Sequence, residues 1–154
     1  MNRHTETLEI KRLTEADLPI FKLLIDLFNT VFEEDQSNIG SDMNLSRLLG
    51  DNHFIGLVAL VDNEVAGGLT AYELPMYYSV SAEIFLYDLA VKTEYQRMGI
   101  GKGLIQSLKE HCREHGIKEF FVMAHEEDEH AIEFYRATGG ESEQVVNFVY
   151  ETTE

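Results

Sequence analysis

A hydrophobic run, a glycine-rich loop and an amphipathic segment follow one another between Glu83 and Glu114, and this order constrains the fold more than any other feature. The run from Ile84 to Val91 is apolar apart from Asp88, as in a strand buried on both faces. After the loop, apolar residues recur with helical spacing at Ile100, Leu104, Ile105, Leu108 and Cys112. The sequence therefore predicts a buried strand, a glycine loop and a helix in direct succession.

The loop has the composition of an anion site. The first N–H groups of a helix are unpaired and carry the positive end of its dipole, and glycines let a bulky anion approach them. Alternating Gly99, Gly101 and Gly103 fit neither GxxxxGK[ST] nor the dinucleotide pattern GxGxxG. What remains is Q-x-x-G-x-G with Arg97 and Lys102 beside the glycines. These residues alone are consistent with an anion site or with an ordinary tight turn.

Length and charge limit the class of protein. The 154 residues suit a single domain over residues 1–154. A net charge of −16 would repel nucleic acid and attract a polycationic small molecule or basic peptide, although acidity can also serve solubility alone. No apolar run is long enough to cross a bilayer and the first nine residues are polar, so we expect a cytoplasmic protein with no membrane partner.

Periodicity and turn residues predict a mixed α/β (α+β) fold. Expected strands cover residues 8–13, 54–61, 64–74, 81–91, 118–124 and 144–150, and expected helices cover 18–32, 41–49, 100–115 and 131–138. Antiparallel pairing is expected in the hairpin and parallel pairing across the two late helices, in a central mixed sheet of six to seven strands. Gly67 and Gly68 suggest a bulge or a close backbone approach.

A histidine at either end of an acidic stretch, His125 and His130, raises the question of a metal. Their spacing fits neither a helical pair four residues apart nor a zinc-finger pattern. We interpret the segment as a solvated loop in which Asp128 caps the next helix, and expect no metal.

Several separated segments resemble the GNAT acetyltransferases, and the resemblance spans nearly the whole chain. Its pyrophosphate loop is similar to Gln96, Arg97, Gly99 and Gly101, and its late helix to Ala131-x-x-Phe134-Tyr135-x-x-x-Gly139. Within the superfamily the chain most resembles the aminoglycoside 3-N-acetyltransferases. That resemblance rests on Asp26-Leu27-Phe28, Phe32, Ala71-Tyr72-x-Leu74-Pro75 and Glu83-Ile84-x-x-Tyr87-Asp88-Leu89-Ala90-Val91. Residues 145–154 are only loosely similar.

The resemblance implies acetyl-CoA as co-substrate. It implies that the backbone of Leu89, Ala90 and Val91 pairs with pantetheine, and that one of these N–H groups polarises the thioester. The pyrophosphate would be held by Gln96, Arg97, Met98, Gly99, Ile100, Gly101 and Lys102.

Three residues are candidates for catalysis. An isolated carboxylate in a buried strand is costly unless it is paired or used, so Asp88 is expected to hold and deprotonate the amine, the alternative being an Asp satisfied by nearby backbone. Glu83 is the weaker candidate, because strand parity places it on the opposite face unless a bulge intervenes. By resemblance Tyr135 protonates the thiolate, whereas its periodicity alone would equally fit a core stripe.

The acceptor site is expected to use carboxylates and tyrosines, which accept hydrogen bonds from ammonium groups. The candidates are Tyr87, Asp88, Tyr72, Glu33, Glu34 and Asp35. We expect an N-acetyltransferase acting on a cationic small molecule, with the 3-amino group of an aminoglycoside as the implied acceptor. A polyamine or protein amine, or a non-catalytic acyl-CoA sensor, are the alternatives. Edge strands and the exposed Tyr77 and Tyr78 could support a homodimer or line a pocket.

Overall fold

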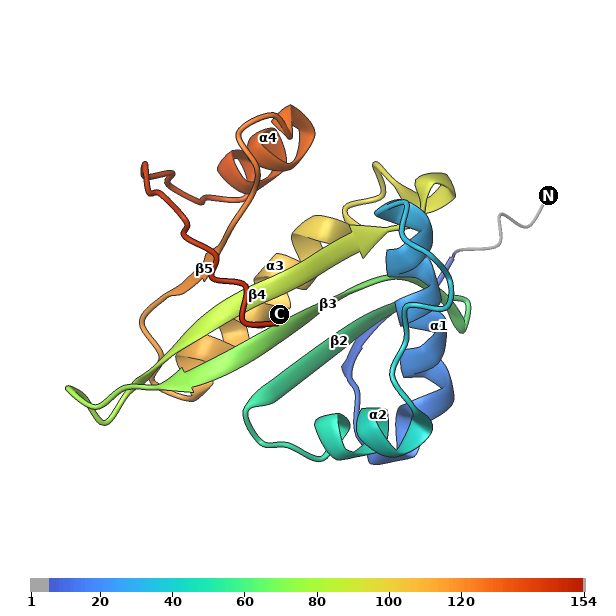
Figure 1. The fold of residues 1–154 in the computed structure, drawn as a ribbon. Coiled ribbons are helices and arrows are strands. Elements are labelled where there is room, and N and C mark those ends of the chain that lie inside the picture. The colour runs from blue at the N-terminus through green and yellow to red at the C-terminus, as the bar shows by residue number, and fades with distance from the viewer. Residues whose placement is uncertain (1–5, 154) are drawn as a thin grey trace. The chain divides into compact units, whose positions relative to one another are not determined.

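A computed structural model describes residues 6–153 of the chain (Figure 1). The chain divides into two compact units, the first ending at Met123 and the second beginning at Ala124. Within the described residues, no helix is both long and apolar enough to cross a bilayer.

The first unit is built on one five-stranded mixed sheet. Its strands are β1 (Leu8–Arg12), β2 (Phe54–Val61), β3 (Glu64–Pro75), β4 (Ala82–Val91) and β5 (Phe120–Val122), in the spatial order β1-β2-β3-β4-β5. The first four strands pair antiparallel with their neighbours, and β4 pairs parallel with β5. The mixed α/β fold is thus confirmed, with the expected antiparallel hairpin and one expected parallel crossover.

The helices of this unit are α1 (Leu18–Val31), α2 (Asp42–Leu49) and α3 (Ile100–Glu114), with 3₁₀ turns η1 (Glu15–Asp17) and η2 (Thr93–Tyr95). α1 and α2 cover one face of the sheet and α3 covers the other (Figure 1). Two glycines fix these faces: a Cβ on Gly68 would lie 2.6 Å from Leu24 of α1, and one on Gly103 would lie 3.0 Å from Ile10 of β1. The helices therefore approach the sheet where side chains are absent.

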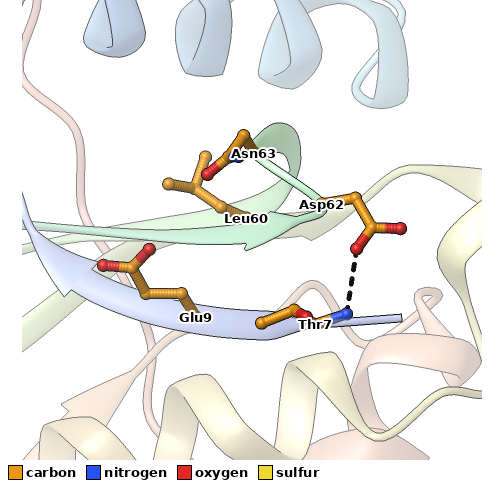
Figure 2. Close-up of a pocket in the computed structure, with 5 residues that line it drawn as sticks. All are labelled: Thr7, Glu9, Leu60, Asp62 and Asn63. Carbon is orange, nitrogen blue, oxygen red and sulfur yellow. Dashed lines mark hydrogen bonds between the residues drawn. The ribbon is translucent and has the colours of Figure 1, made fainter. Parts of the chain in front are cut away.

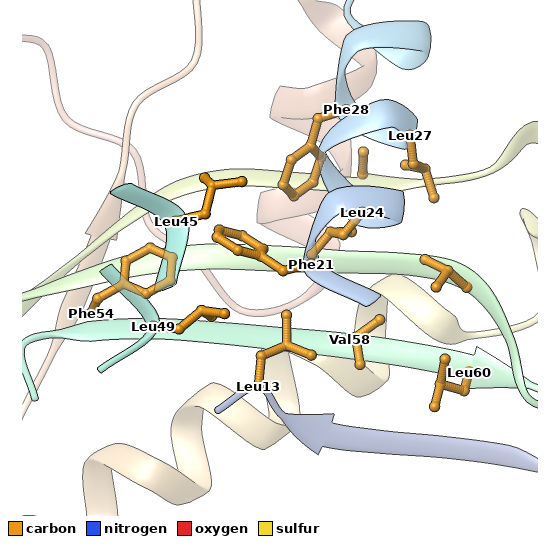
Figure 3. Packing of buried hydrophobic residues seen from close by; sticks show 12 residues of the cluster. Leu13, Phe21, Leu24, Leu27, Phe28, Leu45, Leu49, Phe54, Val58 and Leu60 are labelled. Carbon is orange, nitrogen blue, oxygen red and sulfur yellow. The ribbon is translucent and has the colours of Figure 1, made fainter. Parts of the chain in front are cut away.

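Twelve buried residues form the core between the sheet and α1 and α2 (Figure 3). Phe21, Leu24 and Phe28 project from α1 at helical spacing toward Val58 of β2, and Ala90 brings β4 into the same cluster. The end of β4 is thereby anchored in the core, which holds the adjacent part of the strand in place.

Local turn chemistry agrees with the sequence. Asp62 and Asn63 join β2 to β3 with φ values of 49° and 67°, as a two-residue type I′ hairpin turn requires. A Cβ on Gly67 would lie 2.7 Å from the carbonyl oxygen of Ala90, so the close approach expected at Gly67 and Gly68 is confirmed.

The prediction of six to seven strands is wrong, because the described sheet has five. The expected strand over 118–124 is shortened to Phe120–Val122, and residues 144–150 form no strand. Val145, Phe148 and Tyr150 are exposed. A segment with a β pattern forms a strand only where a neighbouring strand offers an unpaired edge. No strand in residues 6–153 pairs with residues 144–150. The second expected parallel crossover is therefore also absent from the described residues.

The second unit contains α4 (Glu129–Ala137). Asp128 caps this helix as expected, since its carboxylate accepts a 3.0 Å hydrogen bond from the N–H of Ala131. Gly139, with φ of 100°, ends it.

Candidate active site

A β-bulge in β4 sets the geometry of the site. Asp88 lies opposite Thr70 of β3, whereas Leu86 lies opposite Ala71, so Tyr87 is one extra residue on β4. Residues opposite each other in an antiparallel pair project from the same face, and consecutive residues alternate. Asp88 therefore projects from the face of Thr70, which is the face covered by α1.

The bulge also decides where Glu83 lies. Glu83 pairs with Leu74 and Phe85 pairs with Tyr72, and both partners share the face of Thr70. Without the extra residue Glu83 and Asp88 would lie on opposite faces; with it they lie on the same face. At about 3.3 Å per residue they are roughly 15 Å apart along the strand. The two carboxylates thus lie on the same face of the sheet but are too far apart to contact one reacting group together.

Asp88 is a partly buried carboxylate on β4. Among residues 6–123, no N–H or O–H group donates a hydrogen bond to it, so the alternative of an Asp satisfied by nearby backbone does not hold within this unit. Burial raises the pKa of Asp88 above its usual value. Such a group is poised to bind a cation and to accept its proton.

Two tyrosines stand beside this carboxylate. Burial raises the pKa of Tyr72, and the neighbouring Tyr87 and Asp88 raise it further. The rings of Tyr72 and Tyr87 meet edge-on with centroids 5.9 Å apart, and Tyr87 is 59% exposed. The structure therefore brings together three of the residues that the sequence singled out for the acceptor.

The acidic segment after α1 has a different character. Glu33 has a positive φ of 57°, and Asp35 accepts hydrogen bonds from the N–H and hydroxyl of Ser37 at 2.7 and 2.6 Å, which lower the pKa of Asp35. Glu33, Glu34 and Asp35 are all exposed, and no contact described in residues 6–123 joins them to Asp88. Their role in acceptor binding stays a prediction.

β4 and β5 pair over a short distance. β5 pairs with Ile84, Phe85 and Leu86, and beyond them no described strand pairs with this edge of β4. From Leu89 to Val91 this edge is therefore unpaired by any strand of residues 6–123, and only the carbonyl oxygen of Val91 accepts a hydrogen bond there, from Gln96. An extended ligand with amide groups can join such an edge as an added strand. The sequence predicted these residues for that purpose.

The glycine loop follows directly. The side-chain amide of Gln96 donates a 3.2 Å hydrogen bond to the carbonyl oxygen of Val91, which ties the loop to the end of β4. Arg97 has a positive φ of 66°, a conformation that is strained for a non-glycine residue and is often found at functional sites. The exposed Met98 and Lys102 complete its surface.

The start of α3 is open to an anion. Gly99, with φ of 78°, occupies the cap position, where no side chain accepts from the helix. The first hydrogen bond along the helix runs from the N–H of Gly103 to the carbonyl oxygen of Gly99. The N–H groups of Ile100, Gly101 and Lys102 precede it and are the orphan donors of the first turn. A Cβ on Gly99 would meet nothing within 4 Å, so the approach is clear.

Tyr135 lies on α4 in the second unit, where its ring packs 5.2 Å from that of Phe134 and its carbonyl oxygen accepts from the N–H of Gly140. The predicted role of Tyr135 as proton donor stays a prediction.

Two cavities lie outside this site. One of about 340 Å³ is lined by Thr7, Glu9, Leu60, Asp62 and Asn63, where Asp62 accepts a 3.0 Å hydrogen bond from the N–H of Thr7 (Figure 2). The other, of about 690 Å³, runs along α1 and past Lys92. Neither of these two cavities is lined by Asp88 or by the glycine loop.

Comparison with protein families decides the class. Residues 19–139 match the acetyltransferase (GNAT) family. The chain is a member of the GNAT acetyltransferase family. It is thus an acyltransferase, and the mixed fold with its strand, loop and helix is that family's fold. A search of curated proteins with this sequence found no match.

Solved structures agree. This acetyltransferase is 46% identical to an aminoglycoside acetyltransferase from an uncultured soil metagenomic sample in complex with trehalose, with a TM-score of 0.91 over 95% of this chain and 97% of that one. The same soil enzyme has been solved with sisomicin. A second soil metagenomic aminoglycoside acetyltransferase is 34% identical, with a TM-score of 0.90 over 96% and 99% of the two chains.

A more distant structure shares the fold alone. Aminoglycoside N-acetyltransferase AAC(6')-Iy, solved in complex with CoA, is 18% identical, with a TM-score of 0.80 over 98% of this chain and 99% of that one.

Two residues on the site's surface escaped the sequence analysis. Phe85 stacks on Phe121 with ring centroids 4.8 Å apart and ring planes 5° apart, on the face that also carries Asp88. Both belong to apolar runs that predict core positions. Phe121 is exposed because β5 is the last strand of the described sheet. The apolar run around Phe121 does not indicate which strand lies at the edge of the sheet.

Proposed function

We propose that this acetyltransferase transfers the acetyl group of acetyl-CoA to an amine of an aminoglycoside, with the 3-amino group as the favoured position. The observation that carries the proposal is Asp88, a carboxylate that accepts no hydrogen bond within residues 6–123 and lies just beyond the last residue of β4 that pairs with β5. The 46% identity to an enzyme solved with trehalose and, in a second structure, with sisomicin supports the substrate class.

The residues present fit acetyl-CoA. Its pyrophosphate needs donors that a bulky anion can reach, and the open turn at Gly99 to Lys102 supplies them beside Arg97. Its pantetheine arm carries amide groups, and the open edge of β4 from Leu89 to Val91 offers matching backbone groups. When bound, acetyl-CoA supplies the activated acyl group as a thioester.

Asp88 would then handle the proton. An ammonium ion has no free electron pair, so the acceptor must lose a proton before it attacks. The carboxylate of Asp88 first attracts the cationic amine and then takes that proton, directly or through water. A backbone N–H group of the β4 edge donates to the negative charge that develops on the thioester oxygen. The hydroxyl of Tyr135 is the proposed donor of a proton to the departing thiolate.

The first experiment is to measure CoA thiol release from acetyl-CoA with purified protein across aminoglycosides, polyamines and lysine peptides. Turnover with an aminoglycoside, and a product acetylated on its 3-amino nitrogen by NMR, supports the proposal. Acetylation at the 6′-amino nitrogen would keep the substrate class and overturn the position. Turnover with polyamines or peptides alone would overturn the substrate class.

The Asp88→Asn variant tests the mechanism. It should bind CoA as the wild type does, which calorimetry measures, and should lose turnover by about 100-fold or more, the usual contribution of a general base. A protein that binds CoA but shows no turnover with any amine, with or without Asp88, would instead be a sensor.

A further inference from the structure

A row of aromatic rings crosses the sheet on the face of Asp88. The contacts run from Phe21 of α1 to Phe54, Tyr72, Tyr87, Phe85 and Phe121 in turn, with centroids 5.7, 5.5, 5.9, 5.6 and 4.8 Å apart. The ring at the α1 end is buried, with 2% of Phe21 exposed, whereas Tyr87 is 59% and Phe121 40% exposed and Phe85 between them is partly buried. The row therefore begins in the core and ends as an exposed aromatic surface.

This exposed end lies between two carboxylates. Asp88 is beside Tyr87 at one end of the surface, and Glu83 follows Phe85 on the same face at the other. Leu74 and Tyr72 of β3 border it on one side, and Phe121 of β5 borders it on the other. The surface is thus apolar and aromatic in the middle and negative at both ends.

Resting on the proposed function, we propose that Phe85 and Phe121 form the floor on which a ring of the aminoglycoside lies, while Glu83 binds a second ammonium group of the same molecule. Aromatic faces attract cations and apolar C–H surfaces alike, and an amino sugar ring presents both. Carboxylates bind ammonium groups by charge-assisted hydrogen bonds. An acceptor of several rings would therefore be held at two points along β4.

This assigns Glu83 to binding rather than to proton transfer. A general base must come within hydrogen-bond reach of the reacting amine, about 3 Å or one water away. Glu83 is separated from Asp88 by roughly 15 Å of strand, so it cannot serve the amine that Asp88 serves. Glu83 would instead bind a second amine on a neighbouring ring of the acceptor. The site would therefore favour acceptors that are long enough and that carry an ammonium group at both positions.

The test compares two acceptors in wild type and variants, sisomicin and its diamino ring 2-deoxystreptamine alone. Glu83→Gln should raise KM for sisomicin and reduce the preference in kcat/KM for sisomicin over the single ring by about tenfold, the effect of losing one charge-assisted contact. Glu73→Gln is the matched control, because Glu73 pairs with Ile84 on the opposite face of the same strands. It should leave the preference as in the wild type.

A second pair of variants tests the floor. Phe121→Leu keeps an apolar side chain but removes the ring, and it should weaken sisomicin binding severalfold by calorimetry while leaving CoA binding unchanged. Tyr77→Leu, at a 99% exposed ring in the loop before β4, is its control.

The outcomes separate this inference from the proposed function. If wild type acetylates sisomicin but Glu83→Gln and Phe121→Leu match their controls in KM and in sisomicin binding, the inference is overturned and the function stands. A fall in kcat with unchanged KM in Glu83→Gln would overturn the binding role of Glu83. Wild type that neither acetylates nor binds any aminoglycoside would overturn both.

Discussion

Glu83 and Asp88 lie on one face of β4 because Tyr87 is inserted between them as an extra residue. The bulge gives the face toward α1 two acidic side chains, and it leaves Ile84 and Leu86 fully buried on the face toward α3. Bulges are used in this way beside active sites, where they redirect a side chain without ending the strand.

Replacing Asp88 should stabilise the protein at neutral pH. Burial raises the pKa of Asp88 in the folded protein above its ordinary value of 3.8. At pH values between the unfolded-state pKa and the raised folded-state pKa, the folded protein therefore binds more protons than the unfolded chain. Stability conferred by this group therefore falls as pH rises through that window. Asp88→Asn removes a partly buried charge that accepts no hydrogen bond within residues 6–123, and it should raise the free energy of unfolding by about 1 kcal/mol at pH 7.

The gain should shrink as pH is lowered toward 4, because Asp88 in the folded wild type is then increasingly protonated and the buried charge that the variant removes is already neutralised. Thermal unfolding at the two pH values measures it. Asp26→Asn, at an exposed position on α1, changes the net charge equally and should give no comparable gain. Equal effects of the two substitutions would contradict a local origin.

The same pKa shift predicts the acid side of the rate profile. As pH falls below the raised pKa of Asp88, the carboxylate becomes protonated and can no longer accept a proton from the amine. We therefore expect kcat/KM to decrease on the acid side at a pH above 3.8. The residual activity of Asp88→Asn should lack this decrease; an identical acid limb in the variant would assign it to another group.

Valine substitutions at two glycines with left-handed backbones should distinguish an effect on stability from an effect on anion binding. Gly99 has φ of 78° at the start of α3 and Gly116 has φ of 66° just beyond its end, and neither would have a Cβ within 4 Å of another atom. Valine at either position should destabilise the fold by 1–2 kcal/mol or more, the order of magnitude of the left-handed penalty. Only Gly99→Val should also weaken CoA binding, by about tenfold, because its side chain blocks close backbone approach.

Calorimetric titration of CoA into both folded variants measures the difference. If Gly116→Val weakens CoA binding as much as Gly99→Val does, the loop does not contact the anion directly.

Gly68 should tolerate no side chain. A Cβ there would lie 2.6 Å from the Cδ1 of Leu24 and 2.6 Å from the carbonyl oxygen of Leu57, so the backbone neighbour cannot rotate away. Gly68→Ala should lower the free energy of unfolding by about 2–3 kcal/mol through overpacking. Gly40→Ala, whose Cβ would meet its nearest atom at 3.6 Å, should change it by under about 0.5 kcal/mol. Denaturant unfolding of both variants provides the comparison.

Much of the fold was predictable because its signals are local. β2 spans Phe54–Val61 as expected, and α2 begins after Ser41, whose hydroxyl accepts from the N–H of Asn44 at 3.3 Å. The cap expected at Asp128 also forms, because its carboxylate accepts from the N–H of Ala131 at 3.0 Å. Each of these depends on residues a few positions apart, so a short window of sequence contains the whole cause.

The missed features depend on pairing between distant segments. Nothing within the apolar run marks Tyr87 as a bulge, since its extra position exists only relative to Thr70 and Ala71 of β3. The stacking of Phe85 on Phe121 likewise arises because β5 returns beside β4 after α3. The strand expected over 144–150 is absent because a strand also needs a pairing partner. Its residue pattern suits a strand, but no described strand pairs with it.

The hydrogen bond from Gln96 to Val91 joins the glycine loop to the strand that carries Asp88. Because the end of that strand is also anchored in the core through Ala90, the orphan donors at the start of α3 and the carboxylate sit at a fixed separation. On the function proposed above, this separation sets the arm length that an acyl donor needs. A donor with a shorter arm than the pantetheine of CoA would bind its phosphates at the loop without bringing its acyl group to Asp88.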